Sequence, residues 1–341
     1  MTSPQYAAAG VDLDAAEDAK ARIGRLVAGA RTSLSAGAVG AFGGMVRIPP
    51  GMRKPLLVMS TDGVGTKVLV ALQAGRFDTV GEDLVNHSVN DILVHGARPI
   101  AFMDYVAGHR LPAEMIAGIV EGIARGCRQH EMALAGGETA QMPGLYAAGT
   151  FDLAGTIIGV VEEEAALHGS AIAPGDVLIA YASTGLHTNG YTLARHVLFD
   201  VMGLTLTSPV PGGDTSVGDA LLAVHQSYAA AIRPVLDLIH GMAHITGGGI
   251  AGNLIRVLPE HCGATIEPGS WEWPPLFRAI AAGGNVSVAE MRDVFNLGAG
   301  MIAAVPAGNV ERVQAAARAV GVPTWQCGVV EAGVHQVRFN D

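Results

Sequence analysis

Short apolar runs and segments with helical periodicity alternate along almost the whole of this 341-residue sequence. A continuous apolar run is typical of a buried strand, whereas apolar residues spaced three and four apart indicate a helix. We expect strands at residues 56–59, 99–106, 151–161, 177–180 and 299–305, and helices at 79–96, 114–130, 220–240, 253–258 and 310–320. Shorter helices are expected from 192 and over 288–295, the latter begun by a Ser287–Glu290 capping box. This alternation predicts an α/β (α+β-like) chain with mixed strands and helices in both halves.

A change in composition marks the expected boundary between two domains. Three consecutive glutamates, Glu162–Glu164, are followed by Gly169, Pro174 and Gly175, residues typical of a linker. Domains usually contain roughly 100–200 residues, so we expect one over 1–165 and another over 166–341.

The composition excludes several classes of protein. Half of the residues are hydrophobic and only 15% are charged, which argues against disorder. A net charge of −10 without a basic run argues against nucleic-acid binding. No apolar run approaches the roughly 18 residues of a membrane helix. The three cysteines are far apart and odd in number, which favours a reducing compartment. Acidic residues precede the first lysine, the reverse of a secretory signal. We therefore expect a cytoplasmic protein with no membrane partner.

The first candidate motif is Ser60–Lys67, which follows an expected strand. Gly63 and Gly65 allow a tight turn that brings backbone amides near an anion, while Asp62 can hold Mg²⁺ and Thr66 or Lys67 can meet a phosphate. A Walker A loop is excluded because glycine precedes none of the three lysines. An ordinary strand-to-helix turn explains the same pattern.

The second motif lies on the expected helix 79–96. At 100° per residue, Asp83, His87, Asn90 and Asp91 share the face opposite an apolar stripe. Carboxylate, imidazole and amide groups on one face suit Mg²⁺ or a nucleotide. The alternative is a solvated helix face.

The third and fourth motifs combine glycines with polar side chains. Gly136–Thr139 places two glycines before Glu138, which suits a metal ligand or hydroxyl acceptor, although a loop with a surface glutamate fits equally. Ser183–Tyr191 lies between a strand and a helix, where amides and hydroxyls can bind phosphate. His187 lies within that loop and can transfer a proton or stabilise an oxyanion.

The fifth motif, Thr246–Gly252, fits the G-x-G-x-x-G pattern, with Glu267 twenty residues after Gly247. These are the elements of a dinucleotide-binding unit, so NAD binding is one interpretation. A strand-to-helix corner packed through glycines is the other.

In this order and at these separations, the motifs resemble the phosphoribosylformylglycinamidine cyclo-ligase (AIR synthetase) family. The segment most specific to that family is Gly136–Ala140 followed by Met142–Gly144. The other segments that carry the resemblance are Tyr6, Gly10–Asp14, Phe42–Gly44, Asp62–Lys67, Asp83–Val85, Val89–Asp91, His187–Tyr191, Leu254–Pro259, Trp271–Pro274 and Phe295–Asn296.

The resemblance implies two α/β domains, a homodimer formed through the strands of the N-terminal domains, and a C-terminal domain that completes an ATP and substrate groove. The implied reaction is ATP-dependent ring closure of formylglycinamidine ribonucleotide to aminoimidazole ribonucleotide in purine biosynthesis. The implied catalytic residues are Asp62, Asp91 and His187. Mg²⁺ would be held by Asp62, Asp91 and Glu138, and ATP by Gly63, Gly65, Thr66, Lys67, Asn90, Gly136, Gly137, Glu138 and Thr139. The substrate would contact Thr188, Asn189, Gly190, Tyr191, Thr246, Gly247 and Gly248.

The sequence departs from the family pattern at three positions. Gly24 stands where the family usually has lysine, Ala41 where it has glycine, and Ser88 where it often has cysteine. Two other classes remain open: another enzyme of the wider ATP-binding superfamily, such as a kinase or selenophosphate synthetase, and a non-catalytic or NAD-binding protein.

Overall fold

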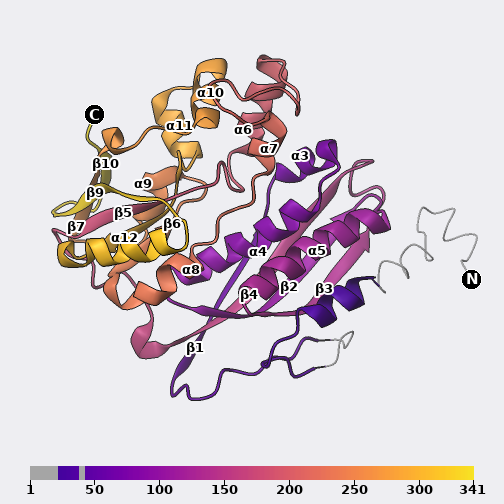
Figure 1. The fold of residues 1–341 in the computed structure, drawn as a ribbon, viewed down its shortest axis with the longest axis horizontal. Coiled ribbons are helices and arrows are strands. Elements are labelled where there is room, and N and C mark those ends of the chain that lie inside the picture. Colours follow the sequence, from indigo (N-terminus) through magenta and orange to yellow (C-terminus); the bar gives the residue numbers. More distant parts are fainter. Residues whose placement is uncertain (1–21, 38–42) are drawn as a thin grey trace, which may run out of the picture. The chain divides into compact units, whose positions relative to one another are not determined.

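The computed structural model describes residues 22–37 and 43–341, which fall into two compact units (Figure 1). The first unit runs to Ile92 and resumes over Arg98–Glu163. The second comprises Leu93–Ala97 and Glu164–Asp341, so the chain passes between the units three times. Each unit has its own sheet.

The first unit is built on a four-stranded sheet in the order β1-β4-β2-β3. Only β2 and β3 are parallel, and α5 provides the crossover between them, as parallel neighbours require. The strands are β1 (Pro55–Gly63), β2 (Arg98–Gly108), β3 (Ala133–Gln141) and β4 (Phe151–Glu162). The helices are one over 22–29, α3 (Lys67–Ala74), α4 (Asp78–Leu93) and α5 (Ala113–Gln129).

Helices α4 and α5 lie side by side across one face of this sheet (Figure 1). Glycines at their contact allow the two backbones to approach closely. A Cβ atom at Gly122 would lie 1.9 Å from the Asp78 carbonyl oxygen, and one at Gly81 would lie 2.0 Å from that of Ile119. This close approach buries the apolar stripe of α4, including Val85.

The opposite face of the sheet carries exposed side chains. On β1, Leu57 and Met59 are 51% and 65% exposed, and on β2 Tyr105 is exposed as well. Register places Leu57 and Met59 opposite Val160 and Ile158 of β4, which pack in a cluster with Leu34, so part of this face is covered by the chain itself. The apolar side chains that stay exposed are of the kind typical of an interaction surface.

The second unit is built on a six-stranded sheet in the order β10-β7-β9-β5-β8-β6, in which only β10 and β7 are parallel. Its strands are β5 (Val177–Ala182), β6 (Gly241–His244), β7 (Cys262–Ile266), β8 (Ala299–Val305), β9 (Thr324–Ala332) and β10 (Val337–Phe339). Its α-helices are α6 (Tyr191–Arg195), α7 (Val217–Leu222), α8 (Ala229–Ile232), α9 (Gly249–Leu254), α10 (Pro275–Gly284), α11 (Val288–Val294) and α12 (Val310–Ala319). The Ser287 hydroxyl accepts from the Glu290 amide, which confirms the expected cap of α11.

Two expected helices of this unit differ from the structure. The helix expected over 253–258 is α9, which begins earlier and ends at Leu254, and the helix expected over 220–240 is broken. Residues 220–240 do not form one continuous helix, because α7 ends at Leu222 and α8 begins only at Ala229. A 3₁₀ segment, Arg233–Leu238, then follows with a proline in its first turn. Pro234 has no N–H to donate, so it cannot continue the α-helical ladder from α8.

The topology also excludes a dinucleotide-binding unit at Gly247–Gly252. Such a unit needs two neighbouring parallel strands joined by a helix. Here β6 lies at one edge of the sheet and pairs antiparallel with β8. The next strand, β7, lies four places away, between β9 and β10. The structural interpretation, a corner packed through glycines, is therefore the correct one.

Two observations concern the chemical environment of the chain. Within residues 22–37 and 43–341, no helix is both long and apolar enough to cross a bilayer. Cys127, Cys262 and Cys327 are all buried free thiols. Burial raises the pKa of the Cys127 thiol and raises that of Cys327 to about 12, so neither is activated as a thiolate.

Asp104 of β2 is a carboxylate placed against the neighbouring strand. A Cβ atom at Gly137 of β3 would lie 2.5 Å from Asp104 Oδ1, so only glycine leaves room for it. Burial raises the pKa of Asp104 to about 7. The folded unit therefore retains a proton that the unfolded chain releases near pH 4.

We predict that Asp104 makes stability fall as pH rises from about 4 to 7, because over that range only the folded state keeps the proton. Replacing Asp104 with Asn removes this titration, so the variant should exceed the wild type in melting temperature at pH 8. Thermal unfolding at pH 5 and pH 8 measures the effect, with exposed Asp152→Asn as the control. An equal difference between Asp104→Asn and wild type at both pH values would contradict the assignment.

Candidate functional site

Three side chains of the first unit converge where β1 ends beside α4. The Nε2 atom of His87 lies 2.8 Å from Asp62 Oδ2 and 3.5 Å from Asp91 Oδ2. His87 and Asp91 are one helical turn apart, which places them on the same face of α4. The sequence predicted Asp62 and Asp91 as metal ligands, and the structure brings them together.

Local hydrogen bonds fix both carboxylates. Asp62 Oδ1 accepts from the Gly63 amide at 2.7 Å, which directs Oδ2 towards His87. Asp91 Oδ2 accepts from the Ser60 hydroxyl at 3.0 Å. Burial opposes ionisation of Asp62, but His87 and the Gly63 amide outweigh it and hold the pKa of Asp62 below its usual value. Burial likewise opposes a charge on His87, yet the neighbouring carboxylates raise its pKa.

The expectation that this face of α4 could be solvated is wrong. Asp83, His87 and Asn90 are all buried, and only Asp91 is partly exposed. Asp83 binds the ammonium group of Lys67, the first residue of α3, at 2.7 Å with both side chains fully buried. Burial lowers the pKa of Lys67, while Asp83 opposes that shift.

This ion pair changes the interpretation of Lys67. Its ammonium group lies inside the unit and holds α3 to α4, so direct contact with a phosphate stays a prediction that this arrangement does not favour. Gly63, Gly65 and Thr66 lie in the turn that links Asp62 to Lys67, and Gly65 has a φ of 55°. These three residues therefore remain beside the carboxylate pair, as the sequence predicted.

The structure contradicts the assignment of Glu138 as a Mg²⁺ ligand together with Asp62 and Asp91. Asp62 pairs with Gly155 of β4, Gly155 with Asp104 of β2, and Asp104 with Gly137 of β3. Three strand spacings of about 4.8 Å separate β1 from β3, roughly 14 Å in all. Glu138 of one chain thus cannot share an ion with Asp62 and Asp91. Gly136, Gly137 and Thr139 lie on the same strand, away from the carboxylate pair, and their contact with another part of ATP stays a prediction.

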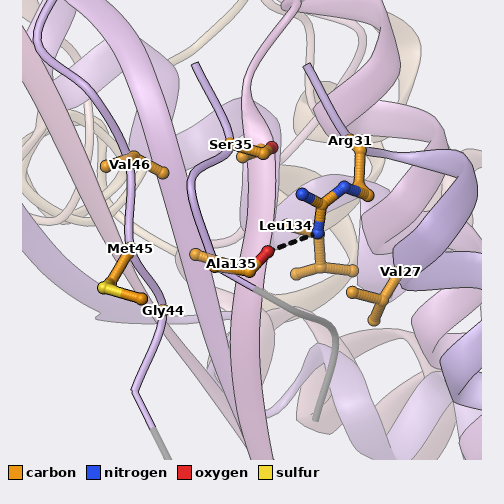
Figure 2. Close-up of a pocket in the computed structure, with 10 residues that line it drawn as sticks. Val27, Arg31, Ser35, Gly44, Met45, Val46, Leu134 and Ala135 are labelled. Carbon is orange, nitrogen blue, oxygen red and sulfur yellow. Dashed lines mark hydrogen bonds between the residues drawn. The ribbon is translucent and has the colours of Figure 1, made fainter. Parts of the chain in front are cut away.

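A small hollow lies between the start of β3 and the loop that includes Gly44 (Figure 2). Leu134 and Ala135 form one side of it, and Arg31 extends beside them. The Arg31 guanidinium donates to the Gly37 carbonyl at 2.7 Å. The hollow has a volume of about 20 Å³, room for roughly one water molecule, so it is a packing gap.

In the second unit, His187 occupies a strained position in the loop between β5 and α6. It is buried, and its φ of 61° is rare for a residue with a side chain. The backbone amides of Thr184 and Gln226 donate to its Nε2 atom, at 3.3 and 3.5 Å. Because Nε2 accepts both bonds, the hydrogen of the neutral ring lies on Nδ1.

Two further histidines lie behind His187, and motif analysis missed both. The ring of His225 stacks on that of His187 with centroids 3.9 Å apart. His225 Nε2 lies 3.1 Å from His244 Nε2, and its Nδ1 lies 3.5 Å from the Thr188 hydroxyl. His225 lies between α7 and α8 where one helix was expected, so no sequence signal placed it here.

The fourth and fifth motifs meet in this unit. A Cβ atom at Gly247 would lie 3.4 Å from Asn189 Oδ1, which places the two loops next to each other. Asn253 fixes the second loop because its amide donates to the carbonyls of Thr246, Gly247 and Gly249.

Glycines let both loops pack against the end of α11. A Cβ atom at Gly249 would lie 1.7 Å from the Arg292 carbonyl oxygen. One at Gly190 would lie 2.3 Å from the ring of Phe295. Gly248 has a φ of 94°. The glycines of the fifth motif therefore serve backbone geometry first.

Tyr191 has a structural role in this arrangement. It is buried, and its hydroxyl donates to the Leu221 carbonyl at 2.5 Å. A substrate contact from its side chain stays a prediction without support from the structure.

A hollow of about 260 Å³ opens beside the first residues of the fourth motif. Ser183, Thr184 and Gly185 form part of its wall, with Asp214 and Asp219 also lining it. Asn296 orders this wall, accepting from the Ser183 hydroxyl and donating to the Gly185 carbonyl. The carboxyl groups of Asp214 and Asp219 add negative charge to this wall, which does not favour phosphate at that side of the hollow.

The fold defines the class of protein. Residues 42–161 match the family described as AIR synthase related protein, N-terminal domain, and residues 173–339 match the C-terminal domain of the same family. A thiamine-monophosphate kinase from Stenotrophomonas maltophilia has the same fold, with a TM-score of 0.69 and 17% identity over 93% of this chain and 94% of that one. A hydrogenase maturation protein HypE solved in complex with ATP has a TM-score of 0.63 and 17% identity, over 92% and 88%.

Relatives that match over nearly their full length identify the family within this class. A phosphoribosylformylglycinamidine cyclo-ligase from Sorangium cellulosum is 47% identical over 99% of this chain and 98% of its own length. One from Desulfatibacillum aliphaticivorans is 44% identical over 97% and 96%. The chain belongs to the phosphoribosylformylglycinamidine cyclo-ligase family, as the motifs predicted.

The family departure at Gly24 generates a prediction. Gly24 lies in the helix 22–29, and a Cβ atom there would meet nothing within 4 Å. Arg22 pairs with Glu114, whereas Arg25 is exposed. Gly24→Lys should fold normally. Replacing glycine inside a helix should stabilise that helix by up to about 1 kcal/mol. The added exposed charge should tighten ATP binding modestly, by roughly 0.2–1 kcal/mol.

Thermal unfolding and ATP calorimetry of wild type, Gly24→Lys and Gly24→Ala measure this. Gly24→Ala provides the helix stabilisation without the charge, so it should leave ATP affinity unchanged. Loss of folding in Gly24→Lys, or equal ATP affinity in all three proteins, would contradict the prediction. Of the other departures, Ala41 lies outside the described residues. Ser88 is buried, and its hydroxyl donates to the Leu84 carbonyl.

Proposed function

We propose that this chain closes the imidazole ring of formylglycinamidine ribonucleotide, using ATP and releasing aminoimidazole ribonucleotide, ADP and phosphate. The observation that carries the proposal is the end-to-end identity of 47% to a relative named for this reaction. The carboxylate cluster of the first unit and the ordered loops of the second supply groups suited to it. The thiamine-monophosphate kinase likeness, at 17% identity, supports the fold alone.

The chemistry needs an activated formyl oxygen. Transfer of the γ-phosphoryl group of ATP to that oxygen, with loss of the formamide N–H proton, gives an iminophosphate and ADP. The ribose-bearing amidine nitrogen then forms a bond to the former formyl carbon, phosphate leaves with the oxygen, and the nitrogen loses its proton. Reactions of this kind require mainly positioning and charge neutralisation from the protein.

Asp62 and Asp91 are the groups we propose to hold Mg²⁺ with the ATP phosphates. Their carboxylates converge, Asp62 is about half exposed, and the neighbouring turn carries Gly63, Gly65 and Thr66. Carboxylate oxygens are the ligands Mg²⁺ prefers, so the residues present fit the ion. When bound, Mg²⁺ supplies positive charge to the phosphate oxygens. The HypE solved in complex with ATP supports nucleotide binding by this fold.

The His187 ring is buried in its loop. Its Nε2 atom already accepts two backbone amides, so it cannot take a substrate proton without breaking them. Its Nδ1 atom is buried as well, so a hydrogen bond from Nδ1–H to a developing oxyanion stays a prediction that this arrangement does not favour. We place the substrate beside this loop, with backbone and side-chain donors from Thr188, Asn189, Gly190 and the loop Thr246–Gly248.

Asp62→Asn tests the carboxylate site. Losing one carboxylate at a preorganised phosphoryl-transfer site should reduce kcat by roughly 10²–10³, with the fold retained. Asp152→Asn is the matched control, because Asp152 also accepts from the amide of its following residue but is an exposed residue of β4 outside the carboxylate cluster.

The measurement is ATP- and formylglycinamidine-ribonucleotide-dependent formation of aminoimidazole. A wild-type protein inactive in this assay would overturn the proposed function. Wild-type turnover in Asp62→Asn would instead remove Asp62 from the site.

We also propose a cytoplasmic homodimer that forms through the exposed part of the sheet face that carries Leu57 and Met59 in the first unit. Its three buried free thiols suit a reducing compartment. Leu57 and Met59 of β1 and Tyr105 of β2 are exposed on that face, and a second copy would bury them.

Met59→Glu should convert the dimer to a monomer, because the introduced charge would be buried without a partner. Sedimentation velocity measures the change in mass. Val288→Glu is the control, since Val288 is 53% exposed on α11 of the other unit. A wild-type monomer, or a dimer that survives Met59→Glu, would count against this interface.

A further inference from the structure

His87 lies on the helix face that the sequence offered for Mg²⁺ or a nucleotide, but it is not among the residues that the family resemblance assigns to the metal. Its Nε2 atom and one oxygen each of Asp62 and Asp91 all lie within 4.8 Å of one another. The side chain of His87 is only 3% exposed, whereas those of Asp62 and Asp91 are 47% and 21% exposed. The imidazole therefore forms the buried side of the cluster, and the two carboxylates form its solvent-exposed side.

The spacing of these atoms matches the first shell of a metal ion. At a metal–ligand distance of about 2.1 Å, neighbouring ligand atoms lie roughly 3.0 Å apart in an octahedron and 3.4 Å apart in a tetrahedron. His87 Nε2 lies 2.8 Å from Asp62 Oδ2 and 3.5 Å from Asp91 Oδ2. An ion could meet all three atoms with small side-chain adjustments.

The surrounding hydrogen bonds leave these three atoms directed at one another. The Gly63 amide donates a hydrogen bond to Asp62 Oδ1, the carboxylate oxygen that does not face His87. The Ser60 hydroxyl donates to Asp91 Oδ2 and orients it. Such outer contacts hold first-shell ligands in place in metal sites. His87 and Asp91 are also fixed one turn apart on the same helix, so their separation is set by α4.

We propose that His87 is a nitrogen ligand of the cation that accompanies ATP, and that the site consequently prefers Mn²⁺ to Mg²⁺. This inference rests on the proposed function for the presence of a divalent cation. Mg²⁺ favours oxygen ligands alone, whereas imidazole suits transition ions, and carboxylates also suit Mn²⁺. Two carboxylates, one imidazole and the phosphate oxygens of ATP form the mixed set that Mn²⁺ accepts.

The experiment uses the full chain, freed of metal with chelator and titrated with Mn²⁺ in the absence of nucleotide. The electron paramagnetic resonance signal of free Mn²⁺ gives the affinity, and competition with Mg²⁺ gives the preference. Pulsed measurements on the bound ion report coupling to a directly ligated ¹⁴N nucleus. Nucleotide is omitted because adenine nitrogens would add a coupling of their own.

The informative variant is His87→Gln, which retains an N–H donor for Asp62 but removes the imidazole. His130→Gln is the matched control, because His130 is also buried and its Nε2 lies 3.1 Å from Asn86 Oδ1 on α4. We expect ¹⁴N coupling in the wild type and in His130→Gln. We expect His87→Gln to lose it, to bind Mn²⁺ at least roughly 10-fold more weakly, and to retain most of its Mg²⁺ affinity.

Bound Mn²⁺ without ¹⁴N coupling, or an unchanged preference for Mn²⁺ over Mg²⁺ in His87→Gln, would overturn the proposal and leave His87 as a hydrogen-bond partner of Asp62. The experiment distinguishes failure of this proposal from failure of the proposed function. Ring closure absent with every metal would remove the reaction, while the coupling measured without nucleotide would still decide whether His87 binds the ion.

Discussion

The buried ion pair between Lys67 and Asp83 is the interaction on which the candidate site of the first unit depends. It joins the first residue of α3 to α4, and the turn that carries Asp62 lies directly before it. A buried pair of this kind is costly to break, because either partner alone is left as an uncompensated charge, at about 3–5 kcal/mol. The pair therefore fixes the end of β1 against the helix face that carries His87 and Asp91.

Much of the fold could be predicted from the sequence, because its strongest signals are local. The helix expected over 114–130 is α5, and the strand over 151–161 is β4, each within one residue at either end. The helix expected over 220–240 is interrupted twice, over residues 223–228 and again at Pro234, although the apolar spacing continues across both points. Periodicity reports which residues face inward, and it does not report whether the backbone is continuous.

The candidate site was harder to predict, because it depends on which elements become neighbours. Asp62 and Asp91 were grouped through the family resemblance, and the structure places both carboxylates beside His87. Glu138 was grouped with them, and sheet order then placed two strands between β1 and β3. His225 and His244 lie beside His187 through contacts that span the second unit, so no short motif contains all three. The buried face of α4 escaped prediction because its polar residues are satisfied by partners distant in sequence.

The path of the chain between the units has a consequence for how the protein can be divided. Residues 93–97 belong to the second unit, although they are synthesised between two halves of the first. Gly96 lies against Leu236 and the Ala165 carbonyl, and Ala97 is buried. A gene fragment starting at residue 164 would encode the second unit without this segment, and no single cut in the sequence separates the units cleanly. The two units are therefore separate in structure but not in the gene. Recombination that exchanged the coding sequence of the first unit as one continuous piece would also exchange residues 93–97 of the second.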